Sequence, residues 1–258
     1  MDNKVSKLYK YREFNQYTEK IITNSSLWYA NPFTFNDPFD MSLSFRQKYS
    51  KREIKSYVKN FIQNYEATKD LSAAEQEHFR RKFEKISNTN AKFIKENNNI
   101  IYDQISKTGV VSLSQCYDSI LMWSHYGDNH KGLVFEFDYL DRKLNLNEFP
   151  HKVDYIAEYD LLSYVENRSE RKKQMSKMLL SKFIAWSYEK EFRIVDFDFQ
   201  GERTFDKKML TKIIFGLRVN PDNMHNTIQL CRDHGFEHVK FEKATKIEGT
   251  FKLQTISI

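Results

Sequence analysis

The sequence predicts an α+β protein in which a mostly antiparallel, strand-dominated sheet carries helices and one helical insertion. Short segments of alternating apolar and polar residues recur near both ends of the chain, as β-strands require. Helical spacing of apolar residues is concentrated in one block, residues 50–98. The 258 residues include only 7 Gly and 4 Pro and no repeated tract, so nothing resembles a linker. We therefore expect a single domain over residues 1–258, with the helical insertion at about residues 46–100.

Before the insertion, the pattern predicts three short elements and a loop. The elements are a strand at residues 7–14, a helix at 18–24 and an extended segment at 25–30. The following sequence NPFTFNDPFD contains two prolines and cannot continue a helix or a central strand. This loop presents Asn36, Asp37 and Asp40, which either line a site or form a stable corner.

Within the insertion, Ile54 and Val58 begin an apolar stripe with the spacing of one helix face. Ser72 followed by Glu75 has the pattern of a capping box, which predicts the start of a second helix. Such stripes are typical of packed cores rather than of ligand sites. The insertion is therefore expected to be a helical subdomain.

The most informative stretch is residues 108–138, TGVVSLSQCYDSILMWSHYGDNHKGLVFEFD. It predicts a strand at 109–114, a short helix at 119–126 and a second strand that ends at residue 138. Alternation in the first strand places Ser112 and Ser114 opposite the apolar face. The segment between the strands is rich in aromatic, imidazole and other pocket-forming groups: Met122, Trp123, His125, Tyr126, His130 and Lys131. A polar wall beside an aromatic floor is typical of a small-molecule pocket.

The last part of the chain adds strands and helices around a second informative stretch, residues 185–199, AWSYEKEFRIVDFDF. From residue 188 its alternation is strict and predicts a strand with Glu189, Glu191 and Arg193 on one face. The other expected elements are a strand at 153–159, a helix at 161–184, a strand at 208–216, a helix at 222–234 closed by Gly235, and strands at 239–243 and 250–258.

Charge and composition indicate the setting. The net charge is +6, and residues 46–96 alone hold 13 Lys or Arg against 7 Asp or Glu. A basic surface favours phosphate-rich partners such as RNA or DNA, although a solvated helical face has the same composition. Cys116 and Cys231 match no metal-ligand or redox spacing, and we expect no metal site. No segment resembles a membrane span or a signal peptide, so a cytoplasmic protein with no membrane partner is expected.

Three predicted strands carry polar side chains opposite apolar ones: Lys10 and Arg12, Ser112 and Ser114, and Glu189 and Glu191. If these strands converge on one cleft, a guanidinium suits a pyrophosphate and the hydroxyls suit a sugar or the edge of a ring. A glutamate beside a glycosidic carbon can stabilise an oxocarbenium-like transition state. Trp123 and Tyr126 can stack on a nicotinamide ring.

A basic residue, then Ser-x-Ser, then Glu-x-Glu, in this order along the chain, resembles the arrangement in mono-ADP-ribosyltransferases. Outside the insertion, most of the chain also resembles a widespread family of uncharacterised bacterial and phage domains. The motifs that carry this resemblance are LYKYR (8–12), LWYANPFTFNDPFD (27–40), VSLSQ (111–115), MWSHYGDNHKGLVFEFD (122–138) and WSYEKEFRIV (186–195). The resemblance implies the ADP-ribosyltransferase fold and an NAD-dependent toxin or phage-defence enzyme. It further implies RNA or DNA as the modified partner, with protein as another possible acceptor and an antitoxin as a further partner.

The resemblance also implies roles for individual residues. Glu191 and Glu189 are the expected catalytic residues. The expected NAD-binding residues are Lys10, Arg12, Ser112, Ser114, Trp123 and Tyr126, and the expected substrate-binding residues are Asn36, Asp37, His125 and His130. Lys10 stands where some transferases of that fold have a strand histidine, so either Lys10 or Arg12 is expected to grip NAD.

Two other functions remain open from the residues alone. One is a nuclease whose Mg²⁺ ligands would be Glu136, Asp138, Glu189 and Glu191, joined by Asp37 or Asp40. The other is a non-catalytic module whose basic helices bind nucleic acid or another partner. The same side chains also have purely structural interpretations: a solvated charge ladder for the glutamates, backbone-bonded hydroxyls for the serines and a core position for Trp123.

Overall fold

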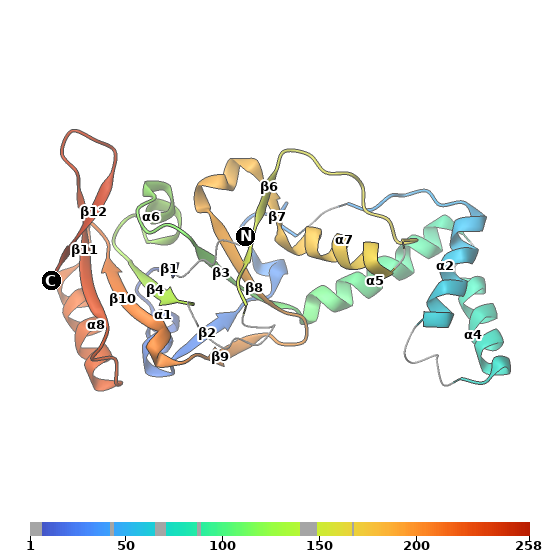
Figure 1. Ribbon diagram of the computed structural model, residues 1–258, viewed down its shortest axis with the longest axis horizontal. Helices are drawn as coiled ribbons and strands as arrows, with labels where there is room; N and C mark the ends of the chain where they lie inside the picture. Colours follow the sequence, from blue (N-terminus) through green and yellow to red (C-terminus); the bar gives the residue numbers. More distant parts are fainter. Residues whose placement is uncertain (1–6, 42–43, 65–70, 87–88, 140–148, 167) are drawn as a thin grey trace.

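The computed structural model describes residues 7–41, 44–64, 71–86, 89–139, 149–166 and 168–258. Figure 1 shows an elongated molecule that has its main sheet at one end and helices α2 (Lys51–Asn64) and α4 (Ala73–Ile86) at the other. Helices α5 (Asn90–Lys107) and α7 (Arg168–Leu180) lie side by side between these two parts. The predicted α+β class is confirmed.

Among the described residues, eight strands form the main sheet in the order β12-β11-β10-β4-β1-β3-β8-β5. Their bounds are β1 (Lys7–Arg12), β3 (Gly109–Ser114), β4 (Leu133–Asp138), β5 (His151–Lys152), β8 (Glu191–Asp196), β10 (Leu210–Phe215), β11 (Lys240–Lys246) and β12 (Leu253–Ser257). Neighbouring strands are antiparallel except β10 and β11, which run parallel. The three strands expected to carry the site, β1, β3 and β8, are therefore direct neighbours.

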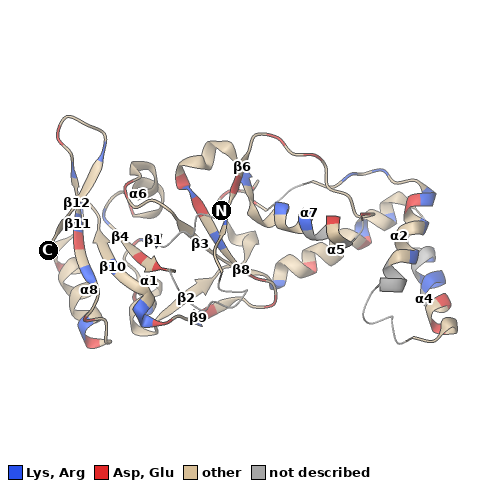
Figure 2. Cartoon of the chain, in the orientation of Figure 1, with Lys and Arg blue, Asp and Glu red and all other residues tan. Residues whose placement is uncertain are grey.

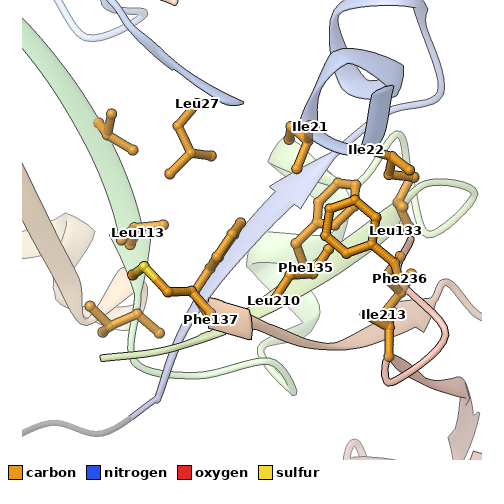
Figure 3. Close-up of a cluster of buried hydrophobic side chains, with 14 of the residues drawn as sticks. Ile21, Ile22, Leu27, Leu113, Leu133, Phe135, Phe137, Leu210, Ile213 and Phe236 are labelled. Carbon is orange, nitrogen blue, oxygen red and sulfur yellow. The ribbon is translucent and has the colours of Figure 1, made fainter. Parts of the chain in front are cut away.

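Helices α1 (Gln16–Thr23) and α8 (Pro221–Asp233) cover the main core on one face of this sheet. Leu113 of β3 and Phe135 and Phe137 of β4 point into that core, as Figure 3 shows. Burial of each such side chain contributes about 1.5–3 kcal/mol, so the alternation of β3 is strongly fixed. As predicted, Ser112 and Ser114 are left on the other side of the strand.

On the opposite face, the short helix α6 (Ile120–Tyr126) packs against β1. Tyr9 and Tyr11 of β1 contact Met122 and Trp123 of α6 in a second apolar cluster. Gly127, the C-cap residue of this helix, is followed by three consecutive residues in the left-handed region: Asp128, Asn129 and His130. Gly132 then passes so close to β1 that a Cβ there would lie 2.1 Å from the carbonyl oxygen of Arg12.

The region of the predicted insertion is helical, and its last helix continues past residue 100. It comprises α2 (Lys51–Asn64), α4 (Ala73–Ile86) and α5 (Asn90–Lys107). The capping box is confirmed, because the Ser72 amide donates to the Glu75 carboxylate at 2.8 Å and the Glu75 amide donates to Ser72 Oγ at 3.3 Å. No described helix of the molecule is both long and apolar enough to span a bilayer.

The remaining elements connect the insertion to the sheet. They are β2 (Ser26–Tyr29) paired with β9 (Gly201–Thr204), η1 (Pro32–Thr34), β6 (Asp154–Ile156) paired with β7 (Ser181–Phe183), α7 (Arg168–Leu180) and η4 (Lys207–Met209). Helix α7 packs on α5 through Met178 and Ile105. Helix α5 leads through its C-cap residue Thr108 directly into β3.

Two predicted boundaries near the site are wrong. The helix expected over residues 161–184 begins only at Arg168 and gives way to the extended residues of β7. The strand expected from residue 188 begins at Glu191, because η3 (Ile184–Glu189) is a 3-10 turn. A three-residue strand is too short to show a period of two, and the sequence of the turn happens to alternate. Both errors fall on residues that shape the cleft described next.

Candidate functional site

A cleft of about 520 Å³ opens where β1 and β3 part. Tyr9 pairs with Ser114 in the ladder between these strands, whereas β1 pairs with β4 along all six of its residues. Just beyond that pair, Lys10 Nζ donates to the carbonyl oxygen of Ser112 at 2.7 Å. The Lys10 side chain thus binds a carbonyl oxygen of β3 where a backbone hydrogen bond between β1 and β3 would otherwise form, and it lines the cleft. The volume lies within the range of about 300–1,000 Å³ that is usual for small-molecule sites.

Most of the residues that the sequence singled out meet in this cleft. Nine of the twelve expected site residues line it: Lys10, Arg12, Asn36, Ser112, Ser114, His125, Tyr126, Glu189 and Glu191. They come from β1, the loop after η1, β3, α6, η3 and β8, so only the folded chain brings them together. The lining also includes residues without an expected role, among them Asp40, Asp128, Asn129 and Lys182.

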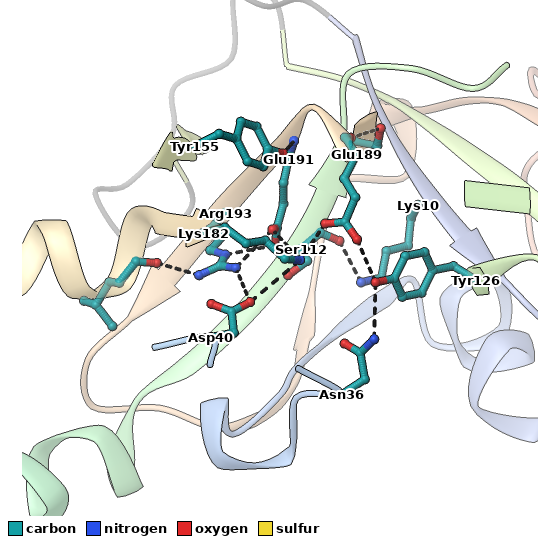
Figure 4. A network of polar contacts seen from close by, with 12 residues as sticks. Lys10, Asn36, Asp40, Ser112, Tyr126, Tyr155, Lys182, Glu189, Glu191 and Arg193 are labelled. Carbon is teal, nitrogen blue, oxygen red and sulfur yellow. Dashed lines mark hydrogen bonds and ion pairs between the residues drawn. The ribbon is translucent and has the colours of Figure 1, made fainter. Parts of the chain in front are cut away.

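One end of the cleft is a network of buried charges, here called the carboxylate cluster, shown in Figure 4. Its members are Asp40, Lys182, Glu189, Glu191 and Arg193, and all five side chains are buried. Arg193 binds Glu191 through two nitrogens, at 2.9 and 3.0 Å, and Asp40 at 2.6 Å. Burial alone raises the pKa of Glu191, but Arg193, with help from Lys182 and Ser112, outweighs it and lowers that pKa to about 2.

Lys182 is the second cation of the carboxylate cluster. Its Nζ lies 2.5 Å from Glu189 Oε2, 3.2 Å from Glu191 Oε2 and 3.7 Å from Asp40 Oδ2. It also lies over the ring of Trp186, 5.1 Å from the centroid. Burial lowers the pKa of Lys182, but the charges of Glu191 and Glu189 outweigh this effect, so the pKa is raised overall. The ammonium therefore stays charged in the folded protein.

Glu189 differs electrostatically from Glu191. Its Oε1 accepts a hydrogen bond from the Tyr126 hydroxyl at 2.7 Å, while its Oε2 binds Lys182. Burial raises the pKa of Glu189, and Lys182 offsets only part of that rise. Two adjacent carboxylates with opposite pKa shifts are typical of sites in which one stays ionised and the other exchanges a proton.

A left-handed residue explains why both glutamates reach the cleft. Lys190 has φ of 44° and lies between η3 and β8, so the chain reverses its twist between the two carboxylates. The hydroxyl of Ser114 donates to the Glu189 carbonyl oxygen at 2.6 Å and holds this turn against β3. Ser114 lines the cleft, but its hydroxyl is already used by the backbone.

The other end of the cleft, formed by Lys10 and Arg12 and here called the cationic end, has no such partners. Within the described part of the chain, neither residue has a carboxylate within ion-pair distance, and Arg12 Nε is buried without a hydrogen-bond partner. Burial, followed by repulsion from Arg12, lowers the pKa of Lys10 to about 7. Unpaired buried donors of this kind are costly unless a ligand uses them.

Three expected site residues lie elsewhere. Trp123 is 0% exposed, donates through Nε1 to the Tyr117 carbonyl oxygen and packs edge-on against Tyr11, so it belongs to the core and presents no face to the cleft. His130 is not among the residues that line the cleft, and its ring stacks on Trp123. Asp37 is buried and accepts from the Phe39 amide at 2.9 Å, which makes it the stable corner that the sequence left as an alternative.

Only some of the carboxylates that a nuclease would need come together: Asp40, Glu189 and Glu191 meet in the carboxylate cluster, where the cations Lys182 and Arg193 bind them. Glu136 does not line the cleft and binds Lys7, Tyr9 and Thr211 instead. Asp138 is also absent from the cleft lining. Within the described ranges, no group of three or more His, Cys, Asp or Glu side chains is arranged to hold a metal ion. The geometry gives the nuclease alternative no support.

The sequence does not predict that Lys182 belongs to the site, nor that Arg193 binds the carboxylates of the cluster. Lys182 falls inside the helix expected at residues 161–184, and the three-residue strand that carries it is too short to show a periodic pattern. Arg193 is expected on the same strand face as Glu191, two residues away, and this spacing could have predicted their ion pair. For Asp40 the sequence predicts a loop carboxylate that lines a site or joins a Mg²⁺ site, and it gives no signal for the ion pair with Arg193.

Comparisons with known proteins give one match. Residues 122–194 match the model of a family described as a protein of unknown function, DUF2971, which agrees with the expected resemblance to an uncharacterised family over that stretch. No curated protein and no solved structure matches the chain, and nothing in these comparisons links it to ADP-ribosyltransferases. The matched stretch contains four of the five residues of the carboxylate cluster, all but Asp40, and neither residue of the cationic end. The chain is thus similar to this family over the part that forms one end of the cleft.

Proposed function

We propose that the protein is an NAD-dependent mono-ADP-ribosyltransferase that modifies a nucleic acid. The observation that carries this proposal is the convergence of three neighbouring strands on one cleft. β1 contributes Lys10 and Arg12, β3 contributes Ser112, and η3 with β8 contributes Glu189 and Glu191. This is the arrangement that the resemblance to mono-ADP-ribosyltransferases required.

The charge of the cleft supports NAD as the co-substrate. The carboxylate cluster holds three carboxylates against two cations, so one negative charge remains uncompensated at that end. The cationic end holds two basic side chains without counterions among the described residues. NAD has the complementary polarity, because its nicotinamide ring is positive and its diphosphate is negative. The buried, unpartnered Nε of Arg12 suits a phosphate oxygen.

The two glutamates have different roles in the proposed reaction. Glu191 supplies a fixed negative charge beside the glycosidic carbon, where positive charge grows as the bond to nicotinamide breaks and its electron pair leaves with nicotinamide. Glu189, held by Tyr126, accepts the proton that the attacking acceptor group loses as its new bond to the same carbon forms. The opposite pKa shifts of the two carboxylates support this division.

The insertion supports nucleic acid as the acceptor. Figure 2 shows Lys and Arg recurring along α2 and α4, which project from the end of the molecule opposite β11 and β12. Residues 46–96 carry 13 basic and 7 acidic residues, an excess equal to the net charge of the whole chain. Basic surfaces of this kind bind phosphate backbones.

The test is to incubate the protein with NAD labelled in the adenylate part, together with total RNA, DNA and protein from cells. We expect label in RNA or DNA, accompanied by release of nicotinamide. Glu189→Gln and Glu191→Gln should each lower the rate by about a hundredfold or more, since the first removes the proton acceptor and the second removes the charge that stabilises the transition state.

His225→Gln is the matched control, because this exposed residue of α8 lies outside the cleft. It should keep the wild-type rate. Label in protein alone would refute nucleic acid as the acceptor, and an absence of nicotinamide release would refute the transferase proposal.

A further inference from the structure

Lys182 lines the cleft, and its burial is not explained by a contribution to stability. A lysine with a side chain only 6% exposed is costly to bury, and an apolar residue would pack in β7 at less cost. Its strand is only three residues long and pairs with β6, where Tyr155 is opposite Lys182. Tyr155 also contacts the site, since its hydroxyl accepts from the Glu191 amide at 2.7 Å. The short β6–β7 pair therefore delivers two side chains to the glutamates.

The contacts of Lys182 fix the orientation of Glu189. Lys182 binds Oε2 of Glu189 from one side, and the Tyr126 hydroxyl binds Oε1 from the other. With both oxygens held, the carboxylate cannot rotate freely. The same ammonium bridges to Glu191 Oε2, so the relative placement of the two carboxylates depends on this one nitrogen.

The charges of the cluster are divided unequally between its two cations. Arg193 binds Glu191 and Asp40, and Glu191 therefore has a strong partner of its own. In the described part of the chain, Glu189 forms no ion pair with Arg193, and Lys182 is the single cation within ion-pair distance of it. Loss of the ammonium would therefore act on Glu189 more than on Glu191.

We propose that Lys182 is a positioning residue that keeps Glu189 ionised and aimed into the cleft, ready to accept a proton from the acceptor. This inference rests on the proposed function and adds to it the residue that makes one of the two carboxylates usable as a base. Lys182 acts through Glu189 and touches neither NAD nor the acceptor in this role.

Several titratable groups besides Lys182 interact electrostatically with Glu189. They are Tyr126 of α6, Glu191 of β8, Tyr155 of β6 and Tyr188 of η3. Three further charged groups belong to the same cleft or cluster: Arg193 of β8, Asp40 of the loop after η1 and Lys10 of β1. All remain in place when only residue 182 is changed. A difference between variants at this position therefore reports the ammonium.

The first experiment measures the Glu189 carboxyl directly and needs no NAD. In protein labelled with ¹³C at glutamate carboxyl carbons, the Glu189 signal is identified by its loss in Glu189→Gln and followed from pH 3 to 9. In Lys182→Met, whose side chain has similar length and no charge, its titration midpoint should rise by about one pH unit or more. In Lys182→Arg, which keeps the charge, the midpoint should stay near the wild-type value, and the Glu191 midpoint should stay low in both variants.

An unchanged Glu189 midpoint in Lys182→Met would overturn the inference, and so would a shift of Glu191 in place of Glu189. If Lys182→Met does not fold, the double variant Lys182→Met with Asp40→Asn removes one carboxylate together with the ammonium and keeps the net charge of the cluster. The Glu189 midpoint should still rise in the double variant, and a wild-type midpoint there would equally overturn the inference.

The second experiment links the ionisation of Glu189 to turnover. The acid limb of the pH–rate profile for transfer from NAD should move upward in Lys182→Met by the same amount as the carboxyl midpoint, and Lys182→Arg should restore it. A carboxyl shift without a shift of the acid limb would refute the role of Glu189 as the base. Absence of any NAD turnover by the wild-type protein would refute the proposed function itself, which the titration does not depend on.

Discussion

The two ends of the cleft are built in opposite ways. In the carboxylate cluster every charged group has an oppositely charged partner within hydrogen-bond or ion-pair distance, and Arg193 alone contacts Glu191, Asp40 and the Leu179 carbonyl oxygen. At the cationic end, Lys10 donates to one carbonyl oxygen and Arg12 keeps an unpaired buried nitrogen. Each end keeps one buried atom without a hydrogen-bond partner, Asp40 Oδ1 and Arg12 Nε, but of the two ends only the carboxylate cluster forms ion pairs between described residues.

This difference separates what stabilises the protein from what receives a ligand. A buried ion-pair network resists rearrangement, because removal of one partner leaves the others desolvated and unpaired. Buried cations without counterions destabilise the folded protein, and binding of an anion offsets this cost. The following predictions test this contrast, from the largest expected effect to the smallest.

The largest effect is expected on stability. Arg193→Met leaves Glu191 and Asp40 buried without their main cation, so the free energy of unfolding should fall by about 3–5 kcal/mol. Arg12→Met makes the same chemical change at the cationic end, where no ion pair is lost. It should change the free energy of unfolding by less than about 1 kcal/mol. Urea unfolding at pH 7 measures both. Equal losses in the two variants would abolish the proposed contrast.

The next effect is on ligand affinity. Arg12→Met and Lys10→Met should each weaken binding of NAD by about tenfold or more, since each removes a charged donor from the diphosphate. Isothermal titration calorimetry gives the dissociation constants, with His225→Gln again as the matched control. Wild-type affinity in both variants would show that the cationic end does not hold the diphosphate.

The same binding should depend on pH in a defined direction. Because the pKa of Lys10 is lowered to about 7 and a bound anion raises it, binding takes up a proton above pH 7 and affinity should fall as pH rises from 7. Lys10→Met should lack this dependence. In the empty protein, the unfolded state holds this proton more tightly between pH 7 and 10.5, so the contribution of Lys10 to stability should rise with pH in that window.

The smallest effect is expected at the insertion. Lys51, Lys55 and Lys59 are exposed and four residues apart along α2, so they share one helix face. Changing all three to Gln should weaken RNA binding by about three- to tenfold at 0.15 M salt and flatten its dependence on salt. NAD affinity should not change. Lys240, Lys246 and Lys252, exposed at the other end of the molecule, provide the matched triple variant, and equal losses from both triples would exclude a specific role for the insertion.

Much of the fold follows from the local pattern. The bounds of β3 and the face of Ser112 were predicted correctly, because alternation with large apolar residues fixes a strand that borders the core. The capping box at Ser72 was also readable, since it involves residues only three apart. The convergence of the three strands was stated as a condition rather than predicted, because nothing local specifies which strands are neighbours.

The site was harder to predict where it depends on partners distant in sequence. The ion pair of Arg193 with Asp40 joins residues 153 positions apart, and the bond from Tyr126 to Glu189 spans 63. Trp123 was expected to stack on a ligand, and its burial depends on how α6 meets β1. Lys182 carried no recognisable pattern at all. Local rules therefore placed the strand side chains, and tertiary contacts decided which of them are functional candidates.

The direct connection of α5 to β3 determines which truncation of this protein preserves the cleft. The last turns of α5 anchor the neighbourhood of the cleft: Tyr102 stacks on Phe33 beside the loop that presents Asn36 and Asp40, and the Ser106 and Thr108 carbonyl oxygens accept from Gln200. A deletion that removes all three insertion helices would thus remove the contacts that support the loop of Asn36 and Asp40 and the start of β3, both of which shape the cleft. A shortened version that spares α5 and loses only α2 and α4 is the one to make.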